Sequence, residues 1–310
     1  MPKAGTVALV GRPNAGKSTL MNRLLAEKLA IVSDKPQTTR QRIVGILTTE
    51  QGQIVFFDTP GIHKPLHRLN RKMLEEAIGA LQEADVIVML RDAAEKFGKG
   101  EAYLLELVSR FPQPKIVALN KIDLVAKHKL LPEIARYAAS GRFAAIVPLS
   151  AATGDGTDRL FDELWKQLPE GELLYDAELL TLHPERFLVA ERIREKVLEA
   201  THHELPFTTA VLLEGWEDAG PDRALVLTAA LLVERDSHKG ILIGKGGATI
   251  KAIGSAARRD LEEFLERKVH LDLHVRHEPG WRENPRLLAE LEGAAVAAAE
   301  LAMSKGPAAD

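Results

Sequence analysis

The chain has 310 residues, and its 45% hydrophobic and 27% charged residues are typical of a globular protein with about two domains. This composition excludes a disordered or collagen-like chain, and the absence of cysteine excludes disulfides and Cys-ligated zinc. The formal charge of −3, from 41 Lys and Arg against 44 Asp and Glu, argues against nucleic-acid binding when taken alone. No apolar run reaches the roughly 18 residues that cross a bilayer, and no signal peptide is recognisable, so we expect a cytoplasmic protein.

Short apolar runs alternate with helical patterns over the first half of the chain. Strands are expected at Thr6–Val10, Ile43–Leu47, Ile54–Asp58, Val86–Leu90, Ile116–Leu119 and Ala145–Leu149. Helices are expected at Leu20–Lys28, Asn70–Glu83, Glu101–Arg110, Pro132–Ala139 and Thr157–Leu168. The alternation predicts a doubly wound, mostly parallel α/β domain over residues 1–172. The turn at Glu50–Gln53 is short enough for a hairpin, which predicts one antiparallel edge strand.

The segment G-R-P-N-A-G-K-S, Gly11–Ser18, follows a predicted strand and opens a predicted helix, as a phosphate-binding loop requires. Lys17 is expected to reach the β- and γ-phosphates of a nucleotide, and the Ser18 hydroxyl to bind Mg²⁺. The glycines let consecutive backbone N–H groups face the phosphate oxygens. The nucleotide-binding residues expected here are Gly11, Asn14, Ala15, Gly16, Lys17, Ser18 and Thr19.

Two further segments are expected at the γ-phosphate. The motif D-T-P-G places Asp58 at the end of a buried strand, where it can hold Mg²⁺, and places the Gly61 N–H within reach of the phosphate. The polar segment Ser33–Arg42 is expected to be the first switch, in which Thr38 or Thr39 completes the Mg²⁺ sphere while the γ-phosphate is present. The sequence does not decide between the two threonines. We expect Lys17, Thr39 and Gly61 to serve hydrolysis most directly.

The motif N-K-I-D, Asn120 to Asp123, follows one predicted strand, and Ser150-Ala151 follows another. Both lie at the carboxyl ends of strands, where open α/β sheets bind ligands. The Asp123 carboxylate can accept the ring N–H and the exocyclic amine of guanine, a donor pair that adenine lacks. Together with Lys121, these residues complete the predicted nucleotide site. The four motifs in this order resemble the translation-factor class of GTPases.

Ile62 stands where Ras-like enzymes carry the glutamine that orients the attacking water. An apolar side chain cannot polarise water, so we expect slow hydrolysis in the absence of a partner. In related GTPases, an asparagine at the position of Asn14 helps to hold a potassium ion. The alternative role of Asn14 is to stabilise the loop, and both roles stay open.

The second half of the chain has a different pattern, α-β-β-α-α-β, over residues 189–285, after a predicted linker at residues 173–188. Its elements are expected at Ala190–His203, Thr208–Glu214, Ala224–Arg235, Gly240–Ile243, Ala248–Leu265 and Val269–Arg276. The G-x-x-G segment within this order resembles the type II KH domain, in which such a turn clamps the backbone of single-stranded RNA. The alternative is a simple helix-breaking turn. The RNA-binding residues expected are Gly244, Lys245, Gly246, Gly247, Lys251 and Arg258.

Charge within this second domain is uneven. Residues 186–285 carry 15 basic and 17 acidic residues, but Ser237–Arg259 carries five basic residues and no acidic one. RNA binding would therefore depend on a local patch and show a modest salt dependence. His270, Asp272 and His274 alternate along a predicted strand and are expected to form its solvent face rather than a metal site.

The motifs G-R-P-N-A-G-K-S, Q-T-T-R-Q-R-I-V-G-I, D-T-P-G-I-H, N-K-I-D and I-G-K-G-G-A-T-I-K resemble those of the bacterial Era GTPases. This resemblance implies a Mg²⁺-dependent GTPase that binds the 3′ end of small-subunit ribosomal RNA and assists assembly of that subunit. It also implies a cytoplasmic location with peripheral membrane contact, and we expect the nucleotide state to set RNA affinity. The alternatives are a signalling switch whose second domain binds a protein or a membrane surface, and an ATPase. Residues 286–310 are expected to form a helix and an Ala-rich tail that has no assigned role.

Overall fold

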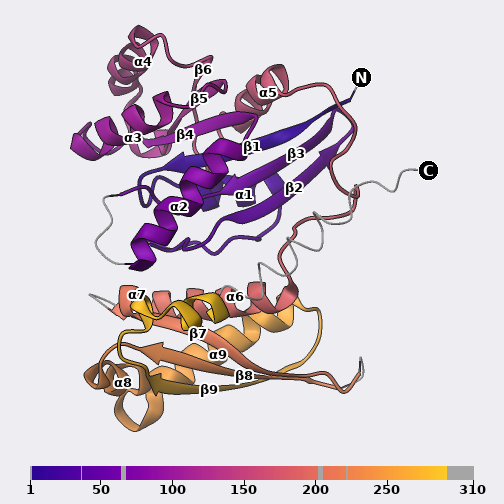
Figure 1. Cartoon of the computed structure of the whole chain (residues 1–310), viewed down its shortest axis with the longest axis vertical. Coiled ribbons are helices and arrows are strands. Elements are labelled where there is room, and N and C mark those ends of the chain that lie inside the picture. Colours follow the sequence, from indigo (N-terminus) through magenta and orange to yellow (C-terminus); the bar gives the residue numbers. More distant parts are fainter. Residues whose placement is uncertain (1, 36, 64–67, 202–204, 221–222, 292–310) are drawn as a thin grey trace. The chain divides into compact units, whose positions relative to one another are not determined.

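The computed structural model describes residues 2–35, 37–63, 68–201, 205–220 and 223–291. Two compact units divide the chain between Thr181 and Leu182, a boundary that lies within the predicted linker (Figure 1). Each unit has its own sheet, and each is described separately below.

The first unit contains a six-stranded sheet in the order β2-β3-β1-β4-β5-β6. Its strands are β1 (Lys3–Gly11), β2 (Ile43–Thr49), β3 (Gly52–Asp58), β4 (Val86–Asp92), β5 (Lys115–Asn120) and β6 (Ala145–Pro148). Only β2 runs antiparallel to its neighbour, and the other four pairings are parallel. The prediction of a mostly parallel sheet with one antiparallel edge strand is confirmed.

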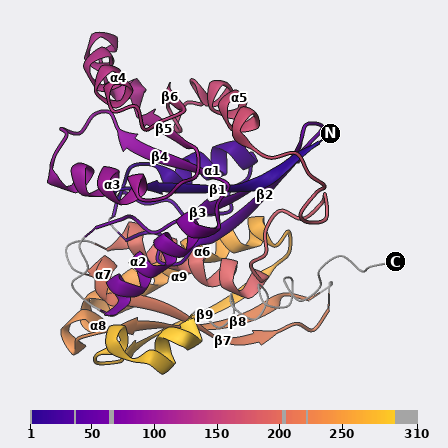
Figure 2. The ribbon, with the colours of Figure 1, turned by 45° about the horizontal axis from the view of Figure 1, so that its top comes forward.

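Helices cover both faces of this sheet, with α1 and α2 on opposite sides (Figure 2). The helices are α1 (Lys17–Leu25), α2 (Arg68–Glu83), α3 (Lys99–Ser109), α4 (Leu130–Ala139) and α5 (Thr157–Gln167), with short 3-10 turns η1 (Ile122–Leu124) and η2 (Lys127–Lys129). Strands β3, β4 and β5 are buried at every position. Burial on both faces explains why these strands read as continuous apolar runs.

Helix α1 begins and ends about three residues earlier than the predicted Leu20–Lys28. Its amino end follows directly from the phosphate loop, whose last glycine, Gly16, has the left-handed φ of 93°. Its carboxyl end is Ala26, which also adopts a left-handed conformation. The Asn22 side chain then accepts hydrogen bonds from the backbone N–H groups of Leu29 and Ala30. No glycine or proline follows Leu25 to mark the end of the helix, so the sequence pattern did not locate it.

The first half of the predicted linker is hydrogen-bonded to the sheet. The Gln53 side chain of β3 accepts from the Tyr175 N–H at 2.9 Å and donates to the Tyr175 carbonyl at 3.0 Å. The Ile46 N–H of β2 donates to the Leu180 carbonyl at 2.7 Å, and the Thr181 hydroxyl donates to the Val44 carbonyl at 2.6 Å. This stretch therefore covers the outer edge of β2.

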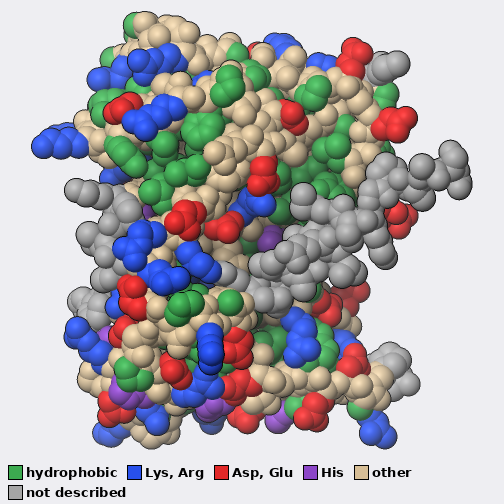
Figure 3. Space-filling model, viewed as in Figure 1, with side chains coloured by type: hydrophobic (Ala, Val, Ile, Leu, Met, Phe, Trp, Pro, Cys, Tyr) green, Lys and Arg blue, Asp and Glu red, His purple; other side chains and the backbone are tan. Residues whose placement is uncertain are grey.

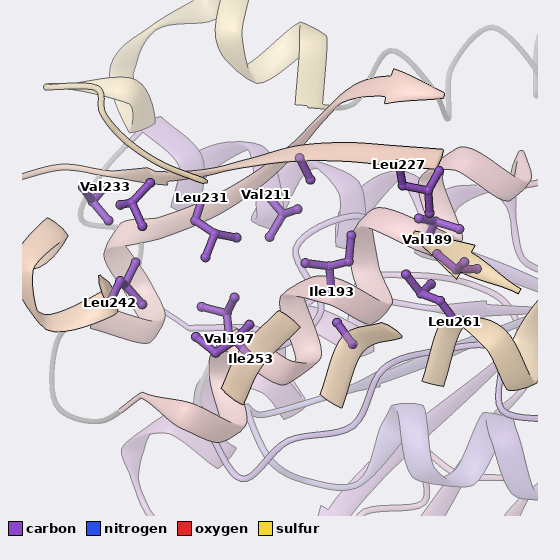
Figure 4. Packing of buried hydrophobic residues seen from close by; sticks show 14 of the residues in the cluster. Val189, Ile193, Val197, Val211, Leu227, Leu231, Val233, Leu242, Ile253 and Leu261 are labelled. Carbon is purple, nitrogen blue, oxygen red and sulfur yellow. The ribbon is translucent and has the colours of Figure 1, made fainter. Parts of the chain in front are cut away.

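The second unit contains a three-stranded sheet in the order β7-β8-β9, with β7 antiparallel and β9 parallel to β8. The elements are α6 (Glu185–Ala200), α7 (Leu205–Thr208), β7 (Thr209–Glu217), β8 (Leu225–Val233), α8 (Asp236–Ile243), η3 (Lys245–Gly247), α9 (Ala248–Phe264), β9 (Val269–His277) and η4 (Trp281–Glu283). Buried side chains from α6, the sheet and α9 converge in one core, which includes Val189, Ile193, Val197, Leu227, Leu231, Ile253 and Leu261 (Figure 4).

Helix α6 begins at Glu185, five residues before the predicted start at Ala190. Pro184 occupies the N-cap, and Phe187 and Leu188 in the first turns are buried. A proline at the start of a helix is tolerated because the first N–H groups have no partner within the helix. The predicted end at His203 lies outside the described residues.

Residues 285–291 are helical, whereas the predicted Ala-rich tail from residue 292 onward lies outside the described residues. Over the part of the chain that the structure describes, no helix is long and apolar enough to span a bilayer.

Candidate functional site

The phosphate loop joins β1 to α1 and is shaped by close contacts. Gly16 has a φ of 93°, and a Cβ at this position would collide with the Asn120 side-chain amide. Asn14 also has a positive φ, 61°, and its side chain donates a hydrogen bond of 2.7 Å to the Asp34 carbonyl. Ala15 is buried. The loop can follow this path because residue 16 is glycine, where any side chain would collide.

Lys17 is the first residue of α1, and its exposed fraction is only 6%. Its ammonium donates to the Arg12 carbonyl at 3.1 Å, within the loop itself. Burial lowers the pKa of Lys17, and the nearby Asp58 carboxylate opposes that shift. A buried cation held by a backbone carbonyl is suited to an anionic ligand that replaces its lost hydration.

Three oxygen-bearing side chains meet beside Lys17. The Ser18 hydroxyl donates to Asp58 Oδ2 at 2.6 Å and lies 2.9 Å from the Thr39 hydroxyl. The Thr39 hydroxyl in turn donates to Asp58 Oδ2 at 3.2 Å. Asp58 is fully buried, and its other oxygen, Oδ1, has no hydrogen-bond partner among the residues that the structure describes. Burial raises the pKa of Asp58, against the effects of Lys17 and the two hydroxyl groups.

This cluster fits Mg²⁺, which prefers hydroxyl, carboxylate and phosphate oxygens. The unpartnered Asp58 Oδ1 is a buried anionic oxygen that a cation or a metal-bound water would satisfy. Of the two threonines that the sequence left open, Thr39 lies in the cluster. The Thr38 hydroxyl instead donates to the Lys35 carbonyl at 2.6 Å.

A cavity of about 350 Å³ lies over these groups. It is lined by the phosphate loop, by the first switch, and by Gly61 and Lys121. Ser33, Asp34 and Gln37, which the motif analysis did not assign individually, also line it. Residues from four predicted motifs thus surround one space.

Gly61 and Ile62 are held close to the phosphate loop. A Cβ at Gly61 would lie 2.7 Å from the backbone of Pro13, so this approach requires glycine. Ile62 is buried, and its backbone N–H donates to the Gly11 carbonyl at 3.0 Å. The Ile62 side chain therefore packs in the core and presents no polar group to a phosphate.

Asn120 connects the phosphate loop with the loop after β6. Its Nδ2 donates to the Ala15 carbonyl at 2.8 Å, and its Oδ1 accepts from the Ala151 N–H at 2.9 Å. Ser150 is buried beside it, whereas the Asp123 carboxylate is exposed. The Asn120 side chain thus holds the two loops together by hydrogen bonds, and the Asp123 carboxylate is accessible to a base.

Two contacts at this end of the sheet could not be assigned from the sequence. Lys121 has a left-handed φ of 65°, and its ammonium pairs with Asp92 of β4 at 2.7 Å. Arg23 of α1 donates to the carbonyls of Ala151, at 3.3 Å, and Ala152, at 2.6 Å. Asp92 and Arg23 belong to no motif, and only the fold brings them to this position.

In the second unit, the G-x-x-G segment forms the turn between α8 and α9. Gly244, Gly246 and Gly247 have φ values of 74°, 61° and 82°. A Cβ at Gly244 would collide with the Thr249 side chain. Lys245 is exposed at the tip of the turn. Three positions with positive φ among the four residues 244–247 explain why glycine is favoured there.

A groove of about 370 Å³ runs beside this turn, between α9 and β9. One face of α9 contributes Lys251, Gly254 and Arg258, while β9 contributes the segment His270–Leu273. Lys251 and Arg258 are exposed. The predicted RNA-binding lysine and arginine therefore line one groove, and His270 and Asp272 form part of its other wall. Over the described residues, no group of three or more His, Asp or Glu side chains could hold a metal ion.

Comparison with known families and proteins agrees with this arrangement. Residues 6–121 match the family of 50S ribosome-binding GTPases, and residues 210–282 match the KH domain. GTPase Era of Geotalea uraniireducens is 47% identical over 93% of this chain and 97% of its own length. GTPase Era of Heliobacterium modesticaldum is 44% identical over 92% of this chain and 95% of its own length.

The chain belongs to the Era family of GTPases. A crystal structure of an Aquifex aeolicus Era variant bound to GDP·AlF4⁻ superimposes with a TM-score of 0.89 and 40% identity, over 94% of this chain and 99% of that one. A crystal structure of Era with MgGDPNP and nucleotides 1506–1542 of 16S ribosomal RNA superimposes with a TM-score of 0.91. It is 39% identical, over 95% of this chain and 100% of that one. The chain is thus a GTPase with a C-terminal KH domain, as its motifs predicted.

Proposed function

We propose that this GTPase binds the 3′ end region of small-subunit ribosomal RNA through its KH domain and assists assembly of the small ribosomal subunit. The observation that carries the proposal is the similarity, over 95% of the chain, to an Era structure with MgGDPNP and a 16S ribosomal RNA segment. The exposed Lys245, Lys251 and Arg258 beside the glycine turn support it from this chain's own residues.

In this proposal each element around the 350 Å³ cavity has a role in nucleotide binding. The phosphate-loop N–H groups and Lys17 bind the phosphates, and the Gly61 N–H contacts the γ-phosphate. Ser18, Thr39 and Asp58 hold Mg²⁺, which neutralises charge on the phosphate oxygens when it is bound. Asp123 accepts two hydrogen bonds from guanine, while Asn120 and Lys121 shape its pocket.

Hydrolysis by the chain alone is slow in this proposal because Ile62 is buried and nonpolar. Asn14 is at the loop position from which related GTPases hold potassium, although its Nδ2 here donates to the Asp34 carbonyl. A potassium role predicts faster turnover in potassium than in sodium buffer at equal ionic strength. Equal rates would assign Asn14 to loop structure alone.

RNA binding relies on the groove rather than on the charge of the whole domain. Figure 3 shows acidic and basic side chains interspersed over the surface of the second unit. Because the basic patch is small and residues 186–285 are net acidic, few phosphates are neutralised, and we expect a salt slope of roughly −2 to −3, about −0.7 for each phosphate. A partner of this kind also implies a cytoplasmic location, whereas peripheral membrane contact stays a prediction from the family resemblance.

The proposal is tested with a labelled RNA of the 16S 3′ end and the full chain loaded with GDP or with a non-hydrolysable GTP analogue. Binding should be tighter with the analogue, and Lys245→Gln together with Lys251→Gln should weaken it about tenfold or more. An RNA of the same length but scrambled sequence is the control. Equal affinity for both RNAs, unaffected by the two substitutions, would favour a signalling switch whose second domain binds another partner.

A further inference from the structure

A further groove on the first unit is separate from the nucleotide cavity and from the groove between α9 and β9. It has a volume of about 580 Å³ and runs between α1, the end of β2 and α5. Its floor is apolar and consists of Leu24, Leu47, Phe161 and Trp165. None of these residues lines the nucleotide cavity or the groove between α9 and β9.

The helical spacing of α5 creates two parallel stripes along this groove. Phe161 and Trp165 are one turn apart and remain half-exposed, while Leu160 and Leu164 of the same helix are buried in the core. Asp158 and Asp162, also one turn apart, form the rim beside the aromatic pair. The helix thus buries one face in the core and leaves a second apolar face only partly covered.

The rim of the groove is anionic. Glu50, in the turn between β2 and β3, joins Asp158 and Asp162 there, and the described residues that line the groove include no lysine or arginine. Over the described residues, none of the three carboxylates lies in an ion pair. Asp162 interacts with the nearby Lys166, but the three carboxylates together still surround the apolar floor with negative charge. Such a rim favours a cationic, partly apolar occupant.

We propose that this groove binds a lysine- or arginine-rich segment of a partner protein, which places an apolar side chain over Phe161 and Trp165. The carboxylates repel a nucleic-acid backbone, so the occupant is a protein rather than RNA. Lysine and arginine stems can cover the aromatic rings while their charged ends reach Asp158, Asp162 and Glu50. An arginine can also stack on Trp165. The site goes beyond the proposed function because its partner is distinct from the RNA.

Trp165 provides a direct readout in the intact protein. The chain has three tryptophans, and labelling with 5-fluorotryptophan gives each a ¹⁹F resonance that a Trp→Phe variant assigns. The probe is a synthetic peptide that alternates lysine with leucine and contains one phenylalanine. We expect saturable movement of the Trp165 resonance, with those of Trp216 and Trp281 unchanged.

The charge argument is tested by Asp158→Asn together with Asp162→Asn, which should weaken the peptide roughly fivefold. The matched control is Glu75→Gln with Glu106→Gln, which removes the same charge from α2 and α3 and should leave binding unchanged. Both variants should hydrolyse GTP at the parent rate, because none of these residues lines the nucleotide cavity.

Four results would overturn the proposal. One is equal binding of a peptide in which glutamate replaces every lysine, and another is equal binding by the parent and the D158N/D162N variant. The third is a Trp165 resonance that responds to the peptide only after residues 292–310 are removed, since the chain's own tail would then be the occupant. Photo-crosslinking from position 161 in cells should reach a basic protein segment, and crosslinks to RNA alone would contradict the idea.

Discussion

Thr38 and Thr39 are adjacent in the chain, but their hydroxyl groups have different partners. Thr39 lies 2.9 Å from Ser18 and 3.2 Å from Asp58 Oδ2, whereas Thr38 donates to the Lys35 carbonyl. We therefore expect Thr39→Ala to lower single-turnover GTP hydrolysis roughly tenfold or more, because a Mg²⁺-binding oxygen is lost. Thr38→Ala should change the rate by less than about threefold. If Thr38→Ala lowered the hydrolysis rate more than Thr39→Ala, the Mg²⁺-binding hydroxyl would be that of Thr38.

Asp123 determines base choice if its carboxylate accepts two N–H groups of guanine. Replacing it with asparagine removes one acceptor and the charge, so we expect Asp123→Asn to weaken GTP binding roughly 100-fold. The asparagine amide can instead donate to the extra carbonyl of xanthine, so XTP should bind the variant better than GTP does. Fluorescent-nucleotide competition measures both affinities. An unchanged preference for GTP would place base recognition elsewhere.

The residues of the nucleotide site were predictable because each has a local signature. The motifs N-K-I-D and G-K-S identify the residues by type and spacing. The strands that precede these motifs place the residues at the edge of the sheet where ligands bind. Asp92 carries no such signature, since its contact with Lys121 exists only because β4 and β5 are neighbours in the sheet. The choice between Thr38 and Thr39 was likewise undecidable, because identical adjacent side chains differ only in backbone direction.

At the level of elements, the groove between α9 and β9 depends on a small residue inside a helix. Gly254 lies in α9, and a Cβ there would be 3.6 Å from the Leu273 side chain across the groove. Gly254→Leu should fill the groove and lower RNA affinity about tenfold or more, while GTP hydrolysis is retained. Gly254→Ala is the matched control, since its methyl group makes an ordinary contact and should raise stability by roughly 0.5–1 kcal/mol. Unimpaired RNA binding by Gly254→Leu would show that RNA does not enter this groove.

A paired arginine and aspartate fasten the loop after β7 to the start of β9. Arg267 donates to both oxygens of Asp218, at 2.9 and 3.0 Å, and these hydrogen bonds lower the pKa of Asp218 to about 2. A carboxyl whose pKa is depressed by folding stabilises the fold above its unfolded pKa near 4, and that contribution is lost as pH falls toward 2. Asp218→Asn should therefore lower Tm at pH 7 by only about 1 °C, because the pair is partly exposed.

The pH series distinguishes this pairing from a general effect of the substitution. The Tm difference between the parent and Asp218→Asn should be constant from pH 7 to pH 5 and shrink between pH 4 and the lowest pH at which both remain folded. Asp236→Asn, at an exposed position of the same unit, serves as the reference variant. A difference for Asp218→Asn that is independent of pH would exclude the ion pair as its cause.

Element types were predictable from periodicity, but several ends were not. Strand β2 was identified as an antiparallel edge because its turn to β3 is short. The missed ends share a physical cause. Ala26 ends α1 in a left-handed conformation that alanine rarely adopts, and α6 starts at a proline-capped turn with buried Phe187 and Leu188. In both places tertiary contacts override the local preference on which the prediction relied.

For the whole molecule, net charge is a poor guide to partners. The chain carries −3 overall, yet a basic patch beside one groove and an acidic rim around another point to opposite kinds of ligand. Binding is decided within about a Debye length, roughly 8 Å at physiological ionic strength, so the local arrangement outweighs the sum. The acidic groove could not be predicted, because α1, β2 and α5 meet only in the folded unit.

The proposed coupling of nucleotide state to RNA affinity has a candidate route through hydrogen-bonded elements of the first unit. The first switch ends at Arg42, and β2 begins at the next residue. Strand β2 is hydrogen-bonded to the linker at Ile46 and Val44, and Gln53 of β3 holds the linker at Tyr175. A change in the first switch on hydrolysis can thus displace β2 and, with it, the segment that leads into the second unit.

This route predicts that loosening the linker separates the two activities. Gln53→Ala removes both bonds to Tyr175, and Thr181→Val removes the bond to the Val44 carbonyl. In the double variant, RNA affinity should be the same with GDP and with the GTP analogue. The fold and the rate of GTP hydrolysis without RNA should be retained. Gln113→Ala, which removes a side-chain bond to the Gln82 carbonyl elsewhere in the same unit, is the control and should keep the difference between the two nucleotide states. If the double variant still distinguished GDP from the analogue as strongly as the parent, the signal would not pass through β2 and the linker.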